Sequence, residues 1–356
     1  MTTASFTSAN NATVKRWSER IMREAFYTNP LSAFMGTSDS AIIQIQTDLD
    51  RLSGDRVRVQ MTPNLDPTTA YISGDGSLSG NEQAIDIYTQ DLTVDTLKVG
   101  VLVSEFDISQ QRVNLNLKQE IYEKLRRVDV EKMRNDLLVA LTDTSAGRTQ
   151  ARYLYGNKES NWDATHATAE GNVTSDDKVT LETIRLAAHK AKYKGLRKMN
   201  PAKVAAMGPN GEAFPVEGFV ALLQPLCARD LKADPNYKNQ IVYNDRLKAT
   251  DAVFNGAFYL GTFEGVHIFE MPDPDDKLLV SGVGSGSIDL GHNLLLGAQA
   301  AIVAMPMMPQ FRLKAEDDYK TKFGVGLIQI RGQDKTVFDS EDWGCVHFFN
   351  AAEADA

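Results

Sequence analysis

The side chains that could support catalysis or bind a metal are widely scattered in this sequence. The five histidines are His166, His189, His267, His292 and His347. None of them forms HxxxH or HExxH, the spacings that place two zinc ligands on one face of a helix. His267 and His347 lie in strand-like runs, where a histidine packed in the core is the better interpretation. Cys227 and Cys345 are 118 positions apart and form no CxxC motif, so we expect neither a zinc site nor a disulfide framework, as in a reducing compartment.

Motifs for nucleophiles and phosphate binding are also missing. The sequence contains no GxSxG, SxxK or Walker-type loop. The glycines from Gly282 to Gly291 suggest a phosphate cradle only faintly, because neither the GxGxxG spacing nor a helix start accompanies them. Residues 273–276 (DPDD) could hold a hard cation, but they lack the EF-hand spacing and are better explained as a solvated turn. We therefore predict no catalytic residue, no cofactor and no metal, and nothing indicates an enzyme.

The composition is that of a large globular protein. The 356 residues are 42% hydrophobic and 24% charged, with a net charge of −9. This is enough for a sizeable core and for two or three domains. An acidic chain is not built to wrap nucleic acid, which calls for a basic surface. The N-terminal residues lack the apolar core of a signal peptide, and no run of 18 apolar residues predicts a membrane span.

One long helical pattern organises the chain. From Val113 to Thr142, apolar residues recur mostly at spacings of three and four, charged residues lie between them, and no Gly or Pro interrupts. A helix of about 30 residues would be roughly 45 Å long. The heptad is too ragged for a coiled coil, so we interpret this helix as the spine of an elongated structural subunit. We expect its core positions to be Leu117, Ile121, Leu125, Val128, Leu137 and Leu141.

Two segments before the spine predict a hairpin. Residues 55–61 and much of 91–103 alternate polar and apolar side chains, the pattern of a strand with one buried face. A long segment rich in Gly, Ser, Pro and Asp joins them. A two-stranded hairpin alone is marginal in water, so this arm should need a partner surface. An active-site lid is the alternative that the sequence leaves open.

The N-terminal segment 13–26 predicts an amphipathic helix with a concentrated positive charge. Its apolar residues share one face, and Lys15, Arg16, Arg20 and Arg23 lie mostly on the others. Such a segment could contact a membrane surface, nucleic acid or a neighbouring subunit. The solvated face of a packed helix explains it equally well.

The rest of the chain mixes helices and strands. Thr180 is placed to cap a helix that ends near Gly195. Pro225 suits the first turn of another helix, which Asp234-Pro235 should stop. Residues 294–305 are apolar enough for deep burial. Strand-like runs begin at Ile42, Gly218, Phe258, Gly265, Lys277, Gly324 and Cys345. Because a regular β-α-β rhythm is absent, we predict an α+β fold.

Short landmarks recur in order along nearly the whole chain. They are Arg16-Trp17, Ala33–Gly36, Gly54-Asp55, Leu78–Glu82, Asp91–Asp95, the spine, Gln224-Pro225, Arg229–Pro235, Gly265–Ile268, Leu294–Ala300, Phe323–Gly326 and Asp342–Val346. Each is weak alone, but their succession over residues 13–350 is specific. It resembles a family of tailed-bacteriophage major capsid proteins, the one that contains the coat protein of the N-four coliphage. Members of that family often have a more Glu-rich segment near Leu78.

The resemblance implies the α+β Hong Kong phage coat fold, also called the Johnson fold. Its parts would be an N-terminal arm (1–50), a hairpin called the E-loop (51–105), a peripheral domain (106–179 and 292–356) with the spine helix (113–142), and an axial domain (180–291). The E-loop would contact neighbouring subunits, and the residues selected for this role are Gly54, Asp55, Tyr71, Gly74, Leu78, Asn81 and Glu82. The basic N-arm residues Lys15, Arg16, Arg20 and Arg23 would face scaffold or DNA on the inside.

The function that the resemblance implies is that of an icosahedral virion shell without catalysis. Homo-oligomers, as hexamers and pentamers, would form around the axial-domain tips and be tied together by E-loops. The shell would enclose double-stranded DNA without sequence-specific binding, and an acidic chain suits a container that must not adhere to DNA. Scaffold, portal and decoration proteins are the further partners expected, and no membrane is expected. Assembly would take place in the host cytoplasm.

Two other functions were weighed against this one. An encapsulin-like compartment has a similar fold and would load protein cargo instead of DNA. A hydrolase whose segment between Met61 and Asp91 is a lid would lose turnover, and not assembly, when an essential Asp or His is replaced.

Overall fold

The computed structural model describes residues 30–46, 56–62, 77, 79–80, 82–104, 117–145, 148–158, 166–195, 197–207, 213–244, 258–314 and 322–354. The described residues fall into two compact units. The smaller contains parts of Leu97–Glu131 and Pro309–Gln329, and the larger contains parts of Asn29–Thr96, Lys132–Met308 and Ile330–Ala356. Helices and strands are mixed along the chain, so the predicted α+β class is confirmed.

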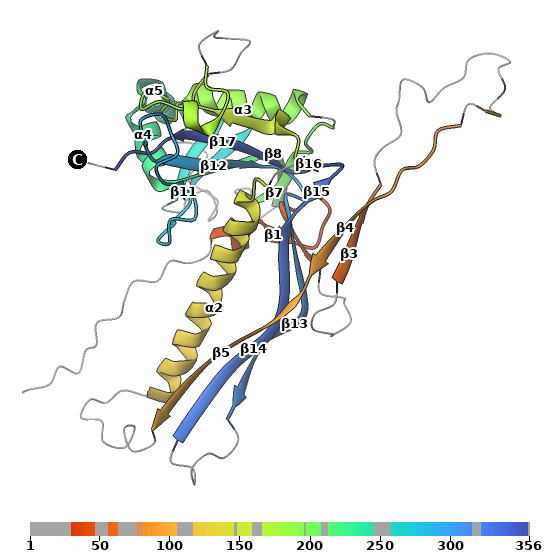
Figure 1. Ribbon diagram of the computed structural model, residues 1–356, viewed down its shortest axis with the longest axis vertical. Coiled ribbons are helices and arrows are strands. Elements are labelled where there is room, and N and C mark those ends of the chain that lie inside the picture. Colours follow the sequence, from red (N-terminus) through yellow and green to blue (C-terminus); the bar gives the residue numbers. More distant parts are fainter. Residues whose placement is uncertain are drawn as a thin grey trace, which may run out of the picture. The chain divides into compact units, whose positions relative to one another are not determined.

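An eight-stranded sheet forms the centre of the larger unit (Figure 1). Its main order is β6 (Tyr153–Tyr155), β17 (Cys345–Ala351), β12 (Leu290–Leu296), β8 (Ala213–Leu223), β10 (Val266–Glu270) and β9 (Tyr259–Phe263). Strand β7 (Ala202–Met207) also pairs with β8, and β11 (Leu279–Val280) pairs with β12. The sheet thus joins strands from both sides of the predicted domain boundaries at 179/180 and 291/292, and those boundaries stay predictions.

Both faces of this sheet are covered, which explains why both sets of alternating side chains in its central strands are buried. Leu295, Val346 and Phe348 pack with helices α3 (Leu181–Tyr193), α4 (Pro225–Ala233) and α5 (Pro235–Asn244). The alternate residues pack on the other side, where Leu294 and Cys345 join the C-terminal end of helix α2 (Leu117–Thr142) and the short helix η1 (Pro30–Phe34). The segment 294–305 is deeply buried, as predicted, because it supplies β12 and the first half of β13 (Ala301–Leu313).

Local signals fix the ends of two helices. Thr180 caps α3 by accepting the backbone N–H of Thr183, and Thr183 reciprocates in a capping box. Pro225 occupies the first turn of α4, and the side chain of Gln224 accepts two backbone N–H groups there. Both predictions are confirmed. The expectation that Asp234-Pro235 only stops a helix is incomplete, because Pro235 also begins α5.

A second sheet has the order β1 (Met35–Gly36), β2 (Ile43–Gln46), β13, β14 (Lys322–Lys335) and β5 (Asp95–Ser104). The single strand expected over 91–103 is divided at Val94. Strand β4 (Tyr88–Thr93) pairs with β3 (Arg56–Met61), whereas β5 pairs with β14. The side chain of Val94 is buried where the chain changes partners. Polar and apolar residues continue to alternate across Val94, so the sequence does not reveal where β4 ends and β5 begins.

The predicted hairpin is formed by β3 and β4, which pair antiparallel with Met61 opposite Tyr88. Its base is not isolated. Val59, Leu92 and Val94 are buried against Ile302 and Ile330 of the same unit. Part of the partner surface that the arm was predicted to need is therefore supplied by the same chain, through Ile302 of β13 and Ile330 of β14. A contact between the rest of the arm and another subunit stays a prediction.

The spine helix begins in the described chain at Leu117, and residues 113–116 lie outside the described residues. Ile121 and Leu125 are buried with Val325 in the smaller unit, and Leu137 and Leu141 are buried in the larger unit.

The expectation that Val128 lines the core is wrong, because this side chain is 48% exposed. Leu137 follows Leu125 by twelve residues. At 3.6 residues per turn this is three full turns and about a third of a turn more, so the two side chains lie on different faces of the helix. The buried side of the helix thus changes along its length, and Val128 lies where the first buried face has ended.

Candidate assembly surfaces

The residues predicted to contact other subunits lie mostly outside the described residues. This holds for Gly54, Asp55, Tyr71, Gly74, Leu78 and Asn81 of the hairpin arm, for Lys15, Arg16, Arg20 and Arg23 of the N-terminal arm, and for the side chain of Leu117. Glu82 is described. It is exposed, and its carboxylate accepts the backbone N–H of Gly80 at 2.7 Å.

Residues Glu82–Ile87, which lead into β4, form an extended segment without strand pairing. We call them the lead segment. Ile85 is 67% exposed and Ile87 is 61% exposed. They are two residues apart, and Asp86 between them is also exposed. They are the most exposed isoleucines of the described chain, on a segment that no strand covers.

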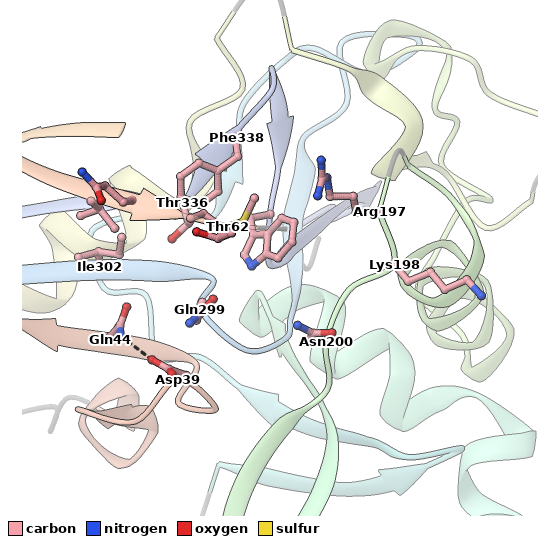
Figure 2. Close-up of a pocket in the computed structure, with 14 residues that line it drawn as sticks. Asp39, Gln44, Thr62, Arg197, Lys198, Asn200, Gln299, Ile302, Thr336 and Phe338 are labelled. Atoms are coloured by element: carbon pink, nitrogen blue, oxygen red, sulfur yellow. Dashed lines mark hydrogen bonds between the residues drawn. The ribbon is translucent and has the colours of Figure 1, made fainter. Parts of the chain in front are cut away.

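A cleft of about 660 Å³ lies in the larger unit (Figure 2). Its apolar lining is Val59, Met61, Ile302, Phe338 and Trp343. Its polar lining is Asp39, Gln44, Gln60, Thr62, Arg197, Lys198, Asn200, Gln299 and Thr336. We call this hollow the amide cleft, after its four carboxamide side chains.

Within the described chain, one polar group of the amide cleft has no hydrogen-bond partner, and one cation has an aromatic partner but no carboxylate. The Thr336 side chain is only 2% exposed, and its hydroxyl has no hydrogen-bond partner there. Arg197 lies with its guanidinium carbon 5.2 Å from the ring centre of Tyr88, a cation–π contact, and no described carboxylate pairs with it. In Figure 2 its guanidinium points towards the labelled residues of the cleft, while Lys198 lies at the rim and points away.

A buried polar cluster lies under the central sheet of the larger unit. Asp342 pairs with Lys335 at 3.0 Å, with His347 at 3.0 Å and with Arg148 at 2.9 Å. His292 Nε2 lies 2.7 Å from His347 Nδ1. Lys335, His347 and Asp342 are at most 1% exposed. No substrate can reach such groups, so this set of acid and base side chains is structural.

The protonation of this cluster follows from its burial. Burial lowers the pKa of His347 to about 4, against the opposing effect of Asp342. The pKa of His292 also lies well below its usual value, because of burial and the neighbouring His347. Burial alone would raise the pKa of Asp342, but the hydrogen bond to His347 and the charge of Lys335 outweigh it and lower the pKa.

The other candidates for chemistry are satisfied by the chain itself. His267 is buried in β10, as expected for a core histidine. In the glycine-rich turn, the backbone N–H of Gly282 donates to Asp289 at 2.8 Å, and that of Ser285 donates to the Val173 carbonyl at 2.9 Å. The carboxylate of Asp273 accepts the N–H groups of Lys277 and Leu278 and closes a turn.

Among the described residues, no group of His, Cys, Asp or Glu side chains could hold a metal ion. Within the same part of the chain, no helix is both long and apolar enough to cross a membrane. The two cysteines are buried thiols.

Comparison with known proteins supplies the family. The model of a family described as phage capsid protein matches residues 5–350. The chain belongs to the phage capsid protein family. It is accordingly a phage major capsid protein, a structural protein of the virion that forms the head shell. No curated protein sequence gives a match.

Solved capsid structures have the same fold as this capsid protein. The capsid asymmetric unit of cyanophage Pam1 is similar with a TM-score of 0.77 at 22% identity, over 99% of this chain and 100% of the other. The capsid of Ralstonia phage GP4 has a TM-score of 0.75 at 18% identity over 100% of both chains. The head structure of Helicobacter pylori bacteriophage KHP40 has a TM-score of 0.70 at 15% identity, over 97% of this chain and 96% of the other. The capsid protein therefore has the predicted Hong Kong phage coat fold.

Sequence reasoning missed the amide cleft entirely. Its lining comes from segments as distant as residues 39 and 343, and neither spacing nor composition brings these together. The one available signal was the concentration of basic residues over 190–198, which begins in α3 and ends with Arg197 and Lys198.

Proposed function

We propose that this capsid protein assembles with itself as hexamers and pentamers into an icosahedral shell around double-stranded DNA, and that the β3–β4 arm ties neighbouring subunits. The exposed pair Ile85 and Ile87 on the unpaired lead segment is the observation that carries this proposal. A shell subunit must keep apolar surface uncovered until its neighbour arrives, whereas a lid would cover a catalytic site.

The rest of the proposal concerns partners and chemistry. The protein acts without catalysis, since the acid and base groups described above are buried or engaged by the chain. The net charge of −9 limits adhesion to the packed DNA. Assembly proceeds in the host cytoplasm with scaffold, portal and decoration proteins as further partners, and the basic residues Lys15, Arg16, Arg20 and Arg23 face inward. The domain limits given above remain part of this proposal.

Deleting Pro63–Glu82 tests the role of the arm. We expect a folded subunit that no longer assembles. The base of the hairpin keeps its buried contacts to Ile302 and Ile330, whereas Ile85 and Ile87, which the deletion leaves in place, are confined to a short turn between Met61 and Tyr88 and cannot extend to a neighbour. Circular dichroism and thermal unfolding report folding, and electron microscopy reports shells. Intact shells from this variant would refute the role of the arm.

A further inference from the structure

We propose that the amide cleft of one subunit receives the lead segment, Glu82–Ile87, of a second copy of this chain. The inference rests on the proposed function and identifies where the arm is received. It starts from a cleft and an exposed segment of the same unit that match in charge and in apolar side chains.

The cleft is suited to an extended backbone. Four consecutive residues of β3 and its end, Val59 to Thr62, line it. Because successive side chains of a strand alternate between faces, four consecutive lining residues place the edge of the strand along the cleft. Among the described residues, strand β3 pairs only with β4. An extended chain can add to such an edge through main-chain hydrogen bonds.

The polar side chains of the amide cleft also suit an extended backbone. Gln44, Asn200 and Gln299 carry both donors and acceptors, which is what the alternating N–H and C=O groups of an extended chain require. The buried, unpartnered hydroxyl of Thr336 points to a ligand that supplies its missing hydrogen bond.

The lead segment matches the cleft in its side chains. Ile85 and Ile87 would cover the apolar lining formed by Ile302, Phe338 and Trp343. Asp86 is exposed and, in the described chain, has no partner, so its carboxylate is available to Arg197. The whole arm between residues 63 and 87 contains four acidic and no basic residues. The basic N-terminal arm, by contrast, has the same sign of charge as Arg197 and Lys198.

The segment of the same chain does not fill this cleft. It precedes β4, and the pairing of Tyr88 with Met61 places it beyond the end of β3. Its two isoleucines are exposed there. The lead segment of a second copy is not held in that position and can supply the same residues. Because each chain carries both the segment and the cleft, the same contact can be repeated around a ring of subunits.

Charge reversal tests the pairing of Asp86 with Arg197. We expect Arg197→Glu alone and Asp86→Arg alone to lower the yield of shells by at least about tenfold, since each places like charges together in every contact. The double variant should restore shells. Lys277→Glu and Asp176→Lys, at exposed positions of the same unit outside the cleft, should assemble like the unmodified protein. Thermal unfolding of each purified subunit separates loss of assembly from loss of folding.

Three outcomes would overturn the proposal. Normal shells from both single variants would show that the pair is not in contact. Two defective single variants without rescue in the double variant would show that the charges act separately. If the arm deletion stops assembly while the charge variants assemble normally, the arm still works but is received elsewhere. If the deletion also assembles, the proposed function of the arm itself fails.

Cysteine pairing identifies whose segment enters the cleft. Asp86→Cys and Arg197→Cys are placed on separate chains, mixed and oxidised, and the native thiols do not compete because Cys227 and Cys345 are fully buried. We expect a disulfide-linked dimer that forms only in the mixture. With both cysteines on one chain, a crosslinked monomer without linked oligomers would instead show that the chain binds its own segment.

Discussion

At the scale of single residues, the cluster around Asp342 shows how this capsid protein keeps charges in its core. Lys335 and Arg148 neutralise the carboxylate, and His347 holds it by a hydrogen bond. Each ion here would be costly if left alone, and removing one partner of a buried pair commonly costs about 3–5 kcal/mol. The cluster also joins β14, β16 (Glu341–Asp342) and β17, which adjoin in the sequence but belong to different sheets.

The cluster predicts that the subunit loses stability as the pH falls. The unfolded chain protonates its histidines near pH 6.5, whereas folding holds His347 neutral down to about pH 4. Between these values the unfolded state binds more protons, so the free energy of unfolding falls with falling pH, by up to about 3 kcal/mol for this group. His292 acts in the same direction, and the lowered pKa of Asp342 adds a further loss at lower pH.

Urea unfolding of the subunit between pH 7 and pH 4 measures this loss. His189→Gln is the matched control for replacing a histidine, because His189 lies on α3, outside the cluster. A free energy of unfolding that stays constant from pH 7 to pH 4 would show that these histidines are not held neutral.

At the scale of elements, the spine helix separates what the sequence can and cannot predict. Its existence follows from apolar residues at helical spacing, and the ends of α3 and α4 follow from Thr180 and Pro225, because capping is a local interaction. The exposure of Val128 and the division of β4 from β5 at Val94 depend on which distant strands lie opposite. The lining of the amide cleft comes from several segments that are distant in the sequence, so no local sequence pattern predicts it.

The helix offers a matched pair of substitutions. Leu125 is 2% exposed and Val128 is 48% exposed, one turn apart on α2. We expect Leu125→Asp to destabilise the subunit by about 3–5 kcal/mol, because it buries an unpaired charge. Val128→Asp should change the free energy of unfolding by less than about 1 kcal/mol. Soluble yield and thermal unfolding compare the two variants. Equal effects at both positions would contradict the packing described for the helix.

At the scale of the whole molecule, the capsid protein combines a fully covered central sheet with apolar groups that stay uncovered on the hairpin arm. Both faces of the sheet are buried within one subunit, so the sheet needs no neighbour to cover it. Ile85 and Ile87 stay exposed, and the proposed function assigns them to contacts between subunits. Such a division lets folding be completed before assembly begins, which suits a subunit made in many copies.

Electron microscopy of the purified full-length chain, over a range of protein concentration and ionic strength, tests self-assembly most directly. We predict closed shells, or rings and tubes of uniform curvature, whose subunits repeat one contact. A folded chain that stays monomeric under every condition would contradict the claim that this protein builds a shell from copies of itself.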